Sequence, residues 1–340
     1  MIDPAWAPAG EAALVAPLTM VIGPGDAGKT TLVTQLANLL FERGFSVGIV
    51  DADVGQSVIG PPTTVGLGRV VRPLTQPGDV ELITMAFVGA TSPAANLTGT
   101  VVATGRMVAR ARAAGLARIV VDTGGLIAGD LGRALKQAKI DLIEPDLVIA
   151  LDRDDACETI VRPYRALSRP RLVRLAPSPA ARRRNAETRR RHREEAFGRY
   201  FAGSRPISLH LKRVVLKRPA LFCGRPMDAE TRREASDVIG RDVIWAEQRS
   251  GDVAVLTNAG LTADEARQLA RVLGAGPVAS YALDDLVGAV AGFDDATGET
   301  IGLGVVRAIA VDPPRLDVQT PVASDAIAAV SIGRTKLSRE

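Results

Sequence analysis

The sequence predicts an α/β fold in which a mainly parallel sheet is flanked by helices and followed by a smaller β-rich domain. Two observations predict it. Short β-branched apolar runs alternate with amphipathic segments in the first part of the chain, and this alternation favours a parallel sheet with right-handed crossovers. Beyond about residue 205, glycine-separated apolar runs predominate, as is typical of strands joined by turns. We therefore expect domains at 1–205 and 206–340.

The individual elements follow from their residue patterns. Buried strands are expected at 17–23, 46–53, 80–89, 117–125 and 145–152, because these runs are short, apolar and rich in β-branched residues. Between them, "KTTLVTQLANLLFERG", "NLTGTVVATGRMVARARAAG" and "DLGRALKQAKIDLIE" have helical spacing. In the second domain, Thr262 followed by Glu265 predicts the start of one short helix. "DDATGET" between two apolar runs predicts a hairpin.

Composition excludes several classes of protein. A hydrophobic content of 46% and a charged content of 24% are those of an ordinary globular protein. No run approaches the roughly 18 apolar residues of a membrane helix, and Asp3 and Glu11 stand where a signal peptide would be positive. We expect a cytoplasmic protein without a membrane partner. Only His192 and His210 are present, so a mechanism with a histidine base is not expected.

The firmest motif is a phosphate-binding loop of the form G-x-x-x-x-G-K-T. Its glycines let backbone N–H groups point inward, and the following helix presents its positive end to the phosphates. Lys29 is expected to reach the β- and γ-phosphates, and the Thr30 hydroxyl to bind Mg²⁺. A strand precedes the loop and a helix follows it, so the motif predicts a P-loop NTPase that binds ATP or GTP. The expected nucleotide-binding residues are Gly23, Pro24, Gly25, Asp26, Ala27, Gly28, Lys29, Thr30 and Thr31.

A pair of carboxylates follows the second expected strand, in "DADVGQSVIGPP". Asp51 and Asp53 are separated by one residue, so one can serve the Mg²⁺ shell while the other faces an acceptor. In phosphoryl transfer, a carboxylate that accepts the proton of the attacking hydroxyl is the usual additional group. Gln56 can hydrogen-bond in the same acceptor region. A solvated loop at the strand end is the alternative interpretation.

Together these motifs resemble a known family. "GPGDAGKTTL", "DADVGQSVIGPP", "FVGATSP" and "VVDTGGLIAGD", in this order and spacing, are similar to the polynucleotide 5′-hydroxyl kinases related to the pre-mRNA cleavage factor kinase and the ribosome-biogenesis kinase, most nearly their short archaeal and bacterial forms. The resemblance covers about residues 16–205, and "GETIGLGVVRAIAVDPPRLDVQTPV" is similar to the C-terminal domain of the family. It implies ATP- and Mg²⁺-dependent transfer of the γ-phosphate to the 5′-hydroxyl end of RNA or DNA.

The resemblance also implies roles for single residues. Asp53 corresponds to the general base, Asp51 to a residue that supports Mg²⁺, and Gln56 to one that holds the acceptor. Lys29 acts on the phosphates.

The family has a substrate clasp of the form Thr-x-Gly-Trp. Its positions match Thr123, Gly124, Gly125 and Leu126, so Thr123, Gly125 and Leu126 are expected to bind substrate. The tryptophan is replaced by leucine, which has no π-face on which a base can stack. At Leu126 the chain therefore departs from the substrate clasp of the family.

The family's lid has the form Arg-x-x-x-Arg, and the arginine-rich stretch at about 179–200 offers Arg189 and Arg193. Spacing of four places both guanidinium groups on one helix face, where they can close over the transferring phosphoryl group. Arg165 and Arg169 have the same spacing in a less similar context, and a solvated helix is the plain alternative.

Charge is unevenly distributed along the chain. The segment from Arg162 to Arg218 contains 18 lysines and arginines against three glutamates and no aspartate, whereas the whole chain carries only +4. Such a segment beside a phosphate loop is typical of a site for a polyanion. We expect it to contact the backbone of nucleic-acid 5′ ends.

Two other functions remain compatible with the sequence. One is a catalytically weak or inactive ATP-binding protein with an assembly or regulatory role, which the leucine at position 126 favours. The other is a P-loop NTPase with water as acceptor, which fits the phosphate loop but not the basic segment.

Overall fold

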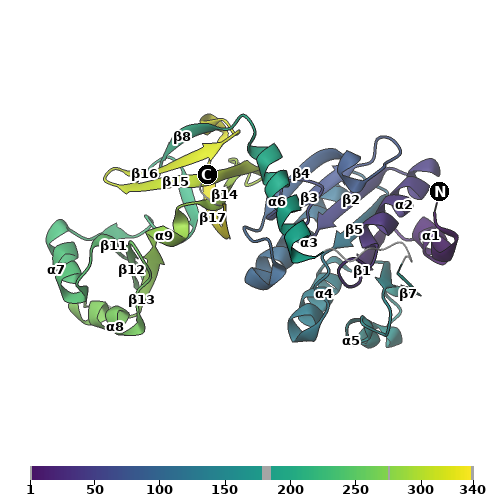
Figure 1. The fold of residues 1–340 in the computed structure, drawn as a ribbon, viewed down its shortest axis with the longest axis horizontal. Helices are drawn as coiled ribbons and strands as arrows, with labels where there is room; N and C mark the ends of the chain where they lie inside the picture. Colours follow the sequence, from purple (N-terminus) through teal and green to yellow (C-terminus); the bar gives the residue numbers. More distant parts are fainter. Residues whose placement is uncertain (1, 178–184, 275, 338–340) are drawn as a thin grey trace. The chain divides into compact units, whose positions relative to one another are not determined.

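A computed structural model describes residues 2–177, 185–274 and 276–337 and divides the chain into two compact units, Met1–Tyr200 and Phe201–Glu340 (Figure 1). The sequence placed the domain boundary after residue 205. Residues 179–184 of the expected lid lie outside the described residues. Within the described ranges, no helix combines the length and the apolar character that crossing a membrane requires.

The first unit is built on one seven-stranded sheet with the order β7-β6-β1-β5-β2-β3-β4. The strands from β7 to β2 run parallel, and β3 is antiparallel to both of its neighbours. The predicted mainly parallel sheet is therefore confirmed. The strands are β1 (Leu18–Ile22), β2 (Val47–Ala52), β3 (Thr64–Arg69), β4 (Glu81–Phe87), β5 (Arg118–Thr123), β6 (Leu147–Leu151) and β7 (Arg171–Leu175).

Two of these strands were not expected from the sequence. β3, "TVGLGR", contains two glycines, and β7, "RLVRL", carries arginine at two of five positions. Neither is a continuous apolar run, because β3 lies among antiparallel partners and β7 is paired on one side, at the edge of the sheet.

Helices cover both faces of this sheet. On one face, α1 and α2 pack over side chains such as Val21 and Ile149, and on the other α3 and α4 pack over Met20 and Val148. Neighbouring strand residues thus enter opposite cores, as the period of two in a strand requires. The helices are α1 (Ala7–Val15), α2 (Lys29–Glu42), α3 (Leu97–Ala113), α4 (Gly129–Ile143), α5 (Glu158–Val161) and α6 (Ala186–Phe201), with short 3₁₀ turns η1 (Pro4–Trp6), η2 (Pro77–Asp79), η3 (Pro93–Ala95) and η4 (Arg162–Ala166).

The second unit contains two sheets. The larger has the order β8-β16-β15-β14-β17-β9, and the smaller has the order β10-β11-β12-β13. The expected hairpin joins β14 and β15, with Gly298 in its turn at a φ of 81°. The strands are β8 (Arg205–His210), β9 (Val215–Arg218), β10 (Arg225–Pro226), β11 (Val243–Gln248), β12 (Val253–Thr257), β13 (Val278–Ala282), β14 (Ala289–Asp294), β15 (Thr300–Val311), β16 (Pro314–Thr320) and β17 (Ala329–Lys336).

The smaller sheet carries two helices on one side, α7 (Ala229–Ile239) and α8 (Ala263–Val272), and α9 (Leu283–Leu286) and η5 (Ser324–Ala326) complete the unit. The start of α8 is the predicted one: Thr262 and Glu265 form a reciprocal capping box. α7 was not expected, because its sequence "AETRREASDVI" contains few large apolar residues, and in the structure only Ala235 of this helix is buried.

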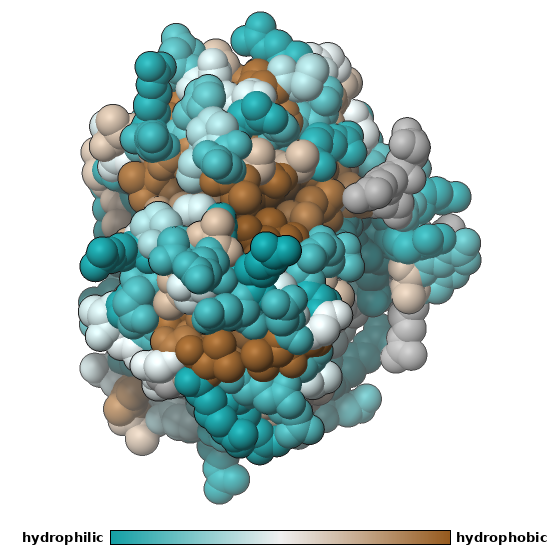
Figure 2. All heavy atoms as spheres, turned by 90° about the vertical axis from the view of Figure 1, so that its left-hand side faces the viewer, coloured by the Kyte–Doolittle hydropathy of each residue, from teal (hydrophilic) through white to brown (hydrophobic). Residues whose placement is uncertain are grey.

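Figure 2 shows the face of the second unit that carries α7 and α8. Hydrophobic side chains gather there in two patches with hydrophilic residues around them. Among the exposed large apolar residues, Val238 belongs to α7 and Val272 to α8.

Candidate active site

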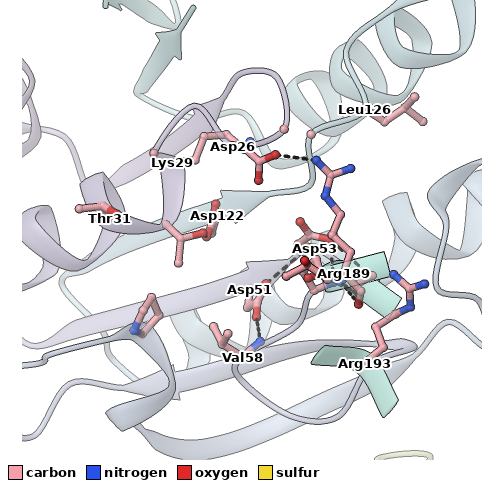
Figure 3. Close-up of a pocket in the computed structure, with 18 of the residues that line it drawn as sticks. Asp26, Lys29, Thr31, Asp51, Asp53, Val58, Asp122, Leu126, Arg189 and Arg193 are labelled. Carbon is pink, nitrogen blue, oxygen red and sulfur yellow. Dashed lines mark hydrogen bonds and ion pairs between the residues drawn. The ribbon is translucent and has the colours of Figure 1, made fainter. Parts of the chain in front are cut away.

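A cavity of about 1300 Å³ lies in the first unit at the carboxyl ends of β1, β2 and β5 (Figure 3). Ligands of open α/β sheets bind at this end of the strands. The structure brings most of the predicted residues to this one cavity, although they come from the phosphate loop, the end of β2, the segment after β5, and α6. The predicted residues in its wall are Gly25, Asp26, Gly28, Lys29, Thr30, Thr31, Asp51, Asp53, Gln56, Gly125, Leu126, Arg189 and Arg193.

The phosphate loop is held tightly against its neighbours. A Cβ at Gly23 would lie 2.3 Å from the carbonyl oxygen of Leu151, so only glycine lets β6 approach this closely. Gly28 has a φ of 91° and precedes the first residue of α2, so the helix N-terminus faces the cavity. Lys29 is buried, and its Nζ donates to the Pro24 carbonyl at 2.6 Å. Burial lowers the pKa of Lys29, while the charges of Asp122 and Asp53 oppose this shift.

Asp122 is a site residue that the sequence interpretation missed. It lies near the end of β5, and its Oδ2 accepts a hydrogen bond of 2.8 Å from the Thr30 hydroxyl. Its Oδ1 is buried and has no hydrogen-bond partner among the described residues. Burial raises the pKa of this carboxyl, and the charge of Lys29 opposes the shift. The available signal in the sequence was "VVDTGG", which places a carboxylate near the end of an expected strand.

Asp51 has a different environment from the one the sequence suggested. Its Oδ1 accepts from the Asp53 amide at 3.1 Å, and its Oδ2 accepts from Ser57 Oγ and from the amides of Val58 and Ile59 at 3.2, 2.7 and 3.1 Å. Burial, with the charges of Asp122 and Asp53, raises the pKa of Asp51 to about 7. Both oxygens are therefore used to hold the loop after β2. The role of Asp51 as a Mg²⁺ ligand stays a prediction, and Asp122, whose Oδ1 has no hydrogen-bond partner among the described residues, is a second candidate.

Asp53 is fixed with part of its carboxylate left free. Its Oδ1 accepts from the amides of Gly55 and Gln56, each at 3.1 Å, and Oδ2 has no hydrogen-bond partner within the described ranges. Gly124 lies directly against the carboxylate, since a Cβ there would be 3.3 Å from both the Cγ and the Oδ1 of Asp53. The Gln56 amide donates to the Arg189 carbonyl at 3.2 Å, so this side chain contacts α6.

The residues of the expected clasp, Thr123, Gly125 and Leu126, lie in different surroundings in the structure. Thr123 is only 1% exposed, and its hydroxyl donates to the Val21 carbonyl at 2.8 Å. The side chain lies behind the wall of the cavity, and its assignment to substrate binding stays a prediction. Gly125 packs on the phosphate loop, where a Cβ would lie 2.4 Å from the Gly25 amide nitrogen. Leu126 lines the cavity and lies away from the carboxylates in Figure 3.

α6 supplies the two predicted lid arginines. Arg189 reaches the phosphate loop and pairs with Asp26, and Arg193 lines the same cavity (Figure 3). Arg165 and Arg169 do not line the cavity and pair with Glu158 and Asp146. Of the two pairs, only the preferred one, Arg189 and Arg193, lines the cavity, and its role as a lid stays a prediction.

The chain is similar to proteins of a known family. Residues 23–203 match the family described as mRNA cleavage and polyadenylation factor CLP1 P-loop. The chain belongs to this family. It is 30% identical over 325 residues to a polyribonucleotide 5′-hydroxyl-kinase of Pyrococcus furiosus, with 94% of this chain and 88% of the relative covered. A polyribonucleotide 5′-hydroxyl-kinase of Methanocaldococcus jannaschii is 27% identical over 308 residues, with 91% and 82% covered.

The structural comparison agrees with the CLP1 P-loop assignment. Clp1p in its complex with Pcf11p (454–563) has the same fold, with a TM-score of 0.60 at 12% identity over 94% of this chain and 74% of that one. The resemblance stated from the motifs and the predicted P-loop fold are therefore confirmed.

Proposed function

We propose that this chain transfers the γ-phosphate of ATP to the 5′-hydroxyl end of a polynucleotide. Its membership of the CLP1 P-loop family and its similarity to polyribonucleotide 5′-hydroxyl-kinases support the proposal. The observation that carries it is the position of Asp53: an aspartate with one unshared carboxylate oxygen lines the same cavity as Lys29 of the phosphate loop. A nucleotide and an acceptor hydroxyl need such a shared space.

Asp53 acts as the base in this reaction. Its free Oδ2 takes the proton of the acceptor hydroxyl, whose oxygen forms a bond to the γ-phosphorus. The bond from the γ-phosphorus to the bridging oxygen breaks and leaves ADP. Because protein groups mostly position and neutralise in phosphoryl transfer, the remaining residues act on charge: Lys29 exchanges its contact with the Pro24 carbonyl for the phosphates, and Arg189 and Arg193 approach from α6.

Thr30 and Asp122 fit a Mg²⁺ ion. The buried Oδ1 of Asp122 is unpartnered within the described chain, and Mg²⁺ prefers oxygen ligands. No group of three His, Cys, Asp or Glu residues in the described ranges is arranged to hold a metal, as fits an ion that is shared with nucleotide phosphates. When bound, Mg²⁺ neutralises charge that develops on the phosphates.

The acceptor is a nucleic-acid 5′ end, RNA or DNA, bound through positive charge. Part of the described basic segment already pairs with carboxylates of the chain. Arg174 pairs with Asp152, Asp155 and Glu158, so we place the contact on α6 and not on the whole range 162–218. Affinity for an oligonucleotide should fall steeply with salt, because each neutralised phosphate releases counterions.

One experiment tests the proposed function. Purified protein, Mg²⁺ and γ-labelled ATP are incubated with a 5′-hydroxyl oligonucleotide, in parallel with the same oligonucleotide already phosphorylated at its 5′ end. Label should enter only the first substrate, and Lys29→Ala should abolish its transfer. Release of labelled phosphate without labelled oligonucleotide would instead mark water as the acceptor. ATP binding without either product would mark an inactive nucleotide-binding protein.

A further inference from the structure

Two lysines on α4, Lys136 and Lys139, are buried directly behind the candidate active site. Each is only 1% exposed, and both are among the largest fully buried side chains of the described chain. Their spacing of three residues places them on one face of the helix. Lysine is almost never fully buried without a partner, because an ammonium group loses its hydration there. The proposed reaction assigns neither lysine a role.

Lys136 holds the segment after β5. Its Nζ donates to the Thr123 hydroxyl at 2.9 Å and to the Gly124 carbonyl at 2.6 Å. Thr123 in turn donates to the Val21 carbonyl of β1, so the contact ties α4 to two central strands. Gly124 is the residue that lies against the Asp53 carboxylate. Lys136 therefore fixes the backbone at Gly124, which contacts the Asp53 side chain.

Lys139 holds the chain on the other side of Asp53. Its Nζ donates to the Ala52 carbonyl at 3.3 Å, and Ala52 directly precedes Asp53. Within the described ranges neither lysine is hydrogen-bonded to a carboxylate, although Asp53 and Asp122 are among the charges that act on both side chains. The two amino groups thus face backbone and hydroxyl oxygens around the proposed base.

We propose that Lys136 and Lys139 are positioning residues that hold Asp53 for proton transfer, an inference that rests on the proposed function. The hydrogen bonds fix Gly124, which lies against the Asp53 carboxylate, and Ala52, which directly precedes Asp53 in the chain. Misplacement of a reacting group by about 1 Å can cost about 100-fold in rate. Loss of either lysine should therefore slow the transfer step much more than it changes nucleotide binding.

The test compares Lys136→Met, Lys139→Met and the matched control Ile140→Ala, which removes a buried apolar side chain from the same helix. Single-turnover transfer to a 5′-hydroxyl oligonucleotide and the affinity for ATP are measured at a temperature where all variants are folded. Each methionine variant should lose about 10- to 100-fold in the transfer rate with ATP affinity within about 2-fold of the wild type. Ile140→Ala should lose stability and keep its rate.

A second pair of variants tests the hydrogen bonds themselves. Lys136→Gln and Lys139→Gln keep an N–H donor without the charge, and should recover more of the transfer rate than the methionine variants at similar unfolding temperatures. The glutamine variants also test the inference if the methionine variants do not fold. Wild-type transfer rates in folded Lys136 and Lys139 variants would overturn the inference while leaving the kinase proposal intact. Failure of the wild-type protein itself to label the oligonucleotide would instead reject the proposed function.

Discussion

Arg189 forms an ion pair with Asp26 of the phosphate loop, with 2.6 Å between Nη2 and Oδ2. The carboxylate that holds this arginine lies in the loop that is expected to surround the nucleotide phosphates. Asp26 has a φ of 60°, a conformation that is uncommon outside glycine, and its side chain is 14% exposed. Arg189 therefore has two competing anionic partners, the loop carboxylate and the nucleotide.

The first prediction is that Asp26→Asn strengthens ATP binding. The substitution removes a negative charge beside the phosphates and releases Arg189, and partly exposed ion pairs of this kind contribute about 1 kcal/mol or less. We expect affinity to rise by about 3- to 5-fold, measured by titration calorimetry with ATP. Asp130→Asn is the matched control, because it removes the partner of Arg133 outside the cavity wall. Weaker binding in Asp26→Asn would show that the carboxylate supports the nucleotide.

The second prediction separates Asp122 from Asp51. Asp122→Asn should reduce transfer by about 100-fold or more and raise the Mg²⁺ concentration needed for half-maximal rate, because a metal ligand is worth several kcal/mol of charge stabilisation. Asp51→Asn should instead lower the free energy of unfolding, by about 1–3 kcal/mol, because the amide Nδ2 cannot accept the hydrogen bonds from Val58 and Ile59. Mg²⁺ titrations and urea unfolding of both variants measure the two effects. A higher Mg²⁺ requirement in Asp51→Asn, with a loss of stability in Asp122→Asn, would instead identify Asp51 as the Mg²⁺ ligand.

The third prediction concerns Asp53. Asp53→Asn keeps the shape of the side chain and removes its proton-accepting oxygen, so turnover should fall by about 10²- to 10⁴-fold. ATP affinity should change little, because Lys29 and the loop amides remain. Single-turnover transfer and ATP titration provide the two measurements. An unaffected rate would mean that another group, or no base at all, takes the proton.

The sequence predicted those parts of the site whose residues lie close together in the chain and form one motif. The phosphate loop, the acidic strand end of β2 and the arginines of α6 were predicted because each is a short run with its own chemistry. Asp122 was missed because its role depends on the adjacency of β1 and β5, which lie about a hundred residues apart in the chain. Strand order is set by packing over the whole sheet, and a single segment carries little of that information.

The same limit applies to Thr123, to the two buried lysines and to α7. Thr123 matches a clasp pattern, yet its hydroxyl faces Val21 and Lys136 because β5 is a central strand. Lys136 and Lys139 were included in an ordinary amphipathic helix, since sequence alone does not show which face of a helix meets an active site. α7 was missed because tertiary contacts stabilise a helix with only one buried residue.

The fourth prediction is that Lys139 makes the free energy of unfolding depend on pH. Burial lowers the pKa of Lys139 to about 8 from the usual 10.5, while the charges of Asp53, Asp51 and Asp122 oppose the shift and Lys136 lies nearby. Between these two values the unfolded chain keeps the proton that the folded chain has lost. The unfolded state binds more protons, so the contribution of Lys139 to stability rises with pH across this range and is lost as pH falls through it.

Lys139→Met should remove this contribution. The difference in free energy of unfolding, wild type minus variant, should grow as pH increases from about 8 to about 10, as measured by urea unfolding at each pH. Taking this difference removes the contribution of groups that titrate in the same way in the wild type and the variant. A difference that stays constant with pH would mean that Lys139 keeps its ordinary pKa in the folded state.

The fifth prediction concerns Leu126, where the chain departs from the clasp pattern of its family. Gly125 fixes the neighbouring backbone against Gly25, and the Leu126 side chain is partly buried in the cavity wall. Leu126→Trp would provide a π-face for a terminal base, and stacking is worth roughly 1–3 kcal/mol, or about 5- to 150-fold in affinity. We therefore expect tighter binding of a 5′-hydroxyl oligonucleotide, measured by fluorescence anisotropy, with unchanged affinity for ATP. The matched control is Leu131→Trp, because Leu131 is 42% exposed on α4 outside the cavity wall. If Leu126→Trp folds, binds ATP and gains no more oligonucleotide affinity than Leu131→Trp, then position 126 does not contact the terminal base, and acceptor binding depends on the arginines of α6.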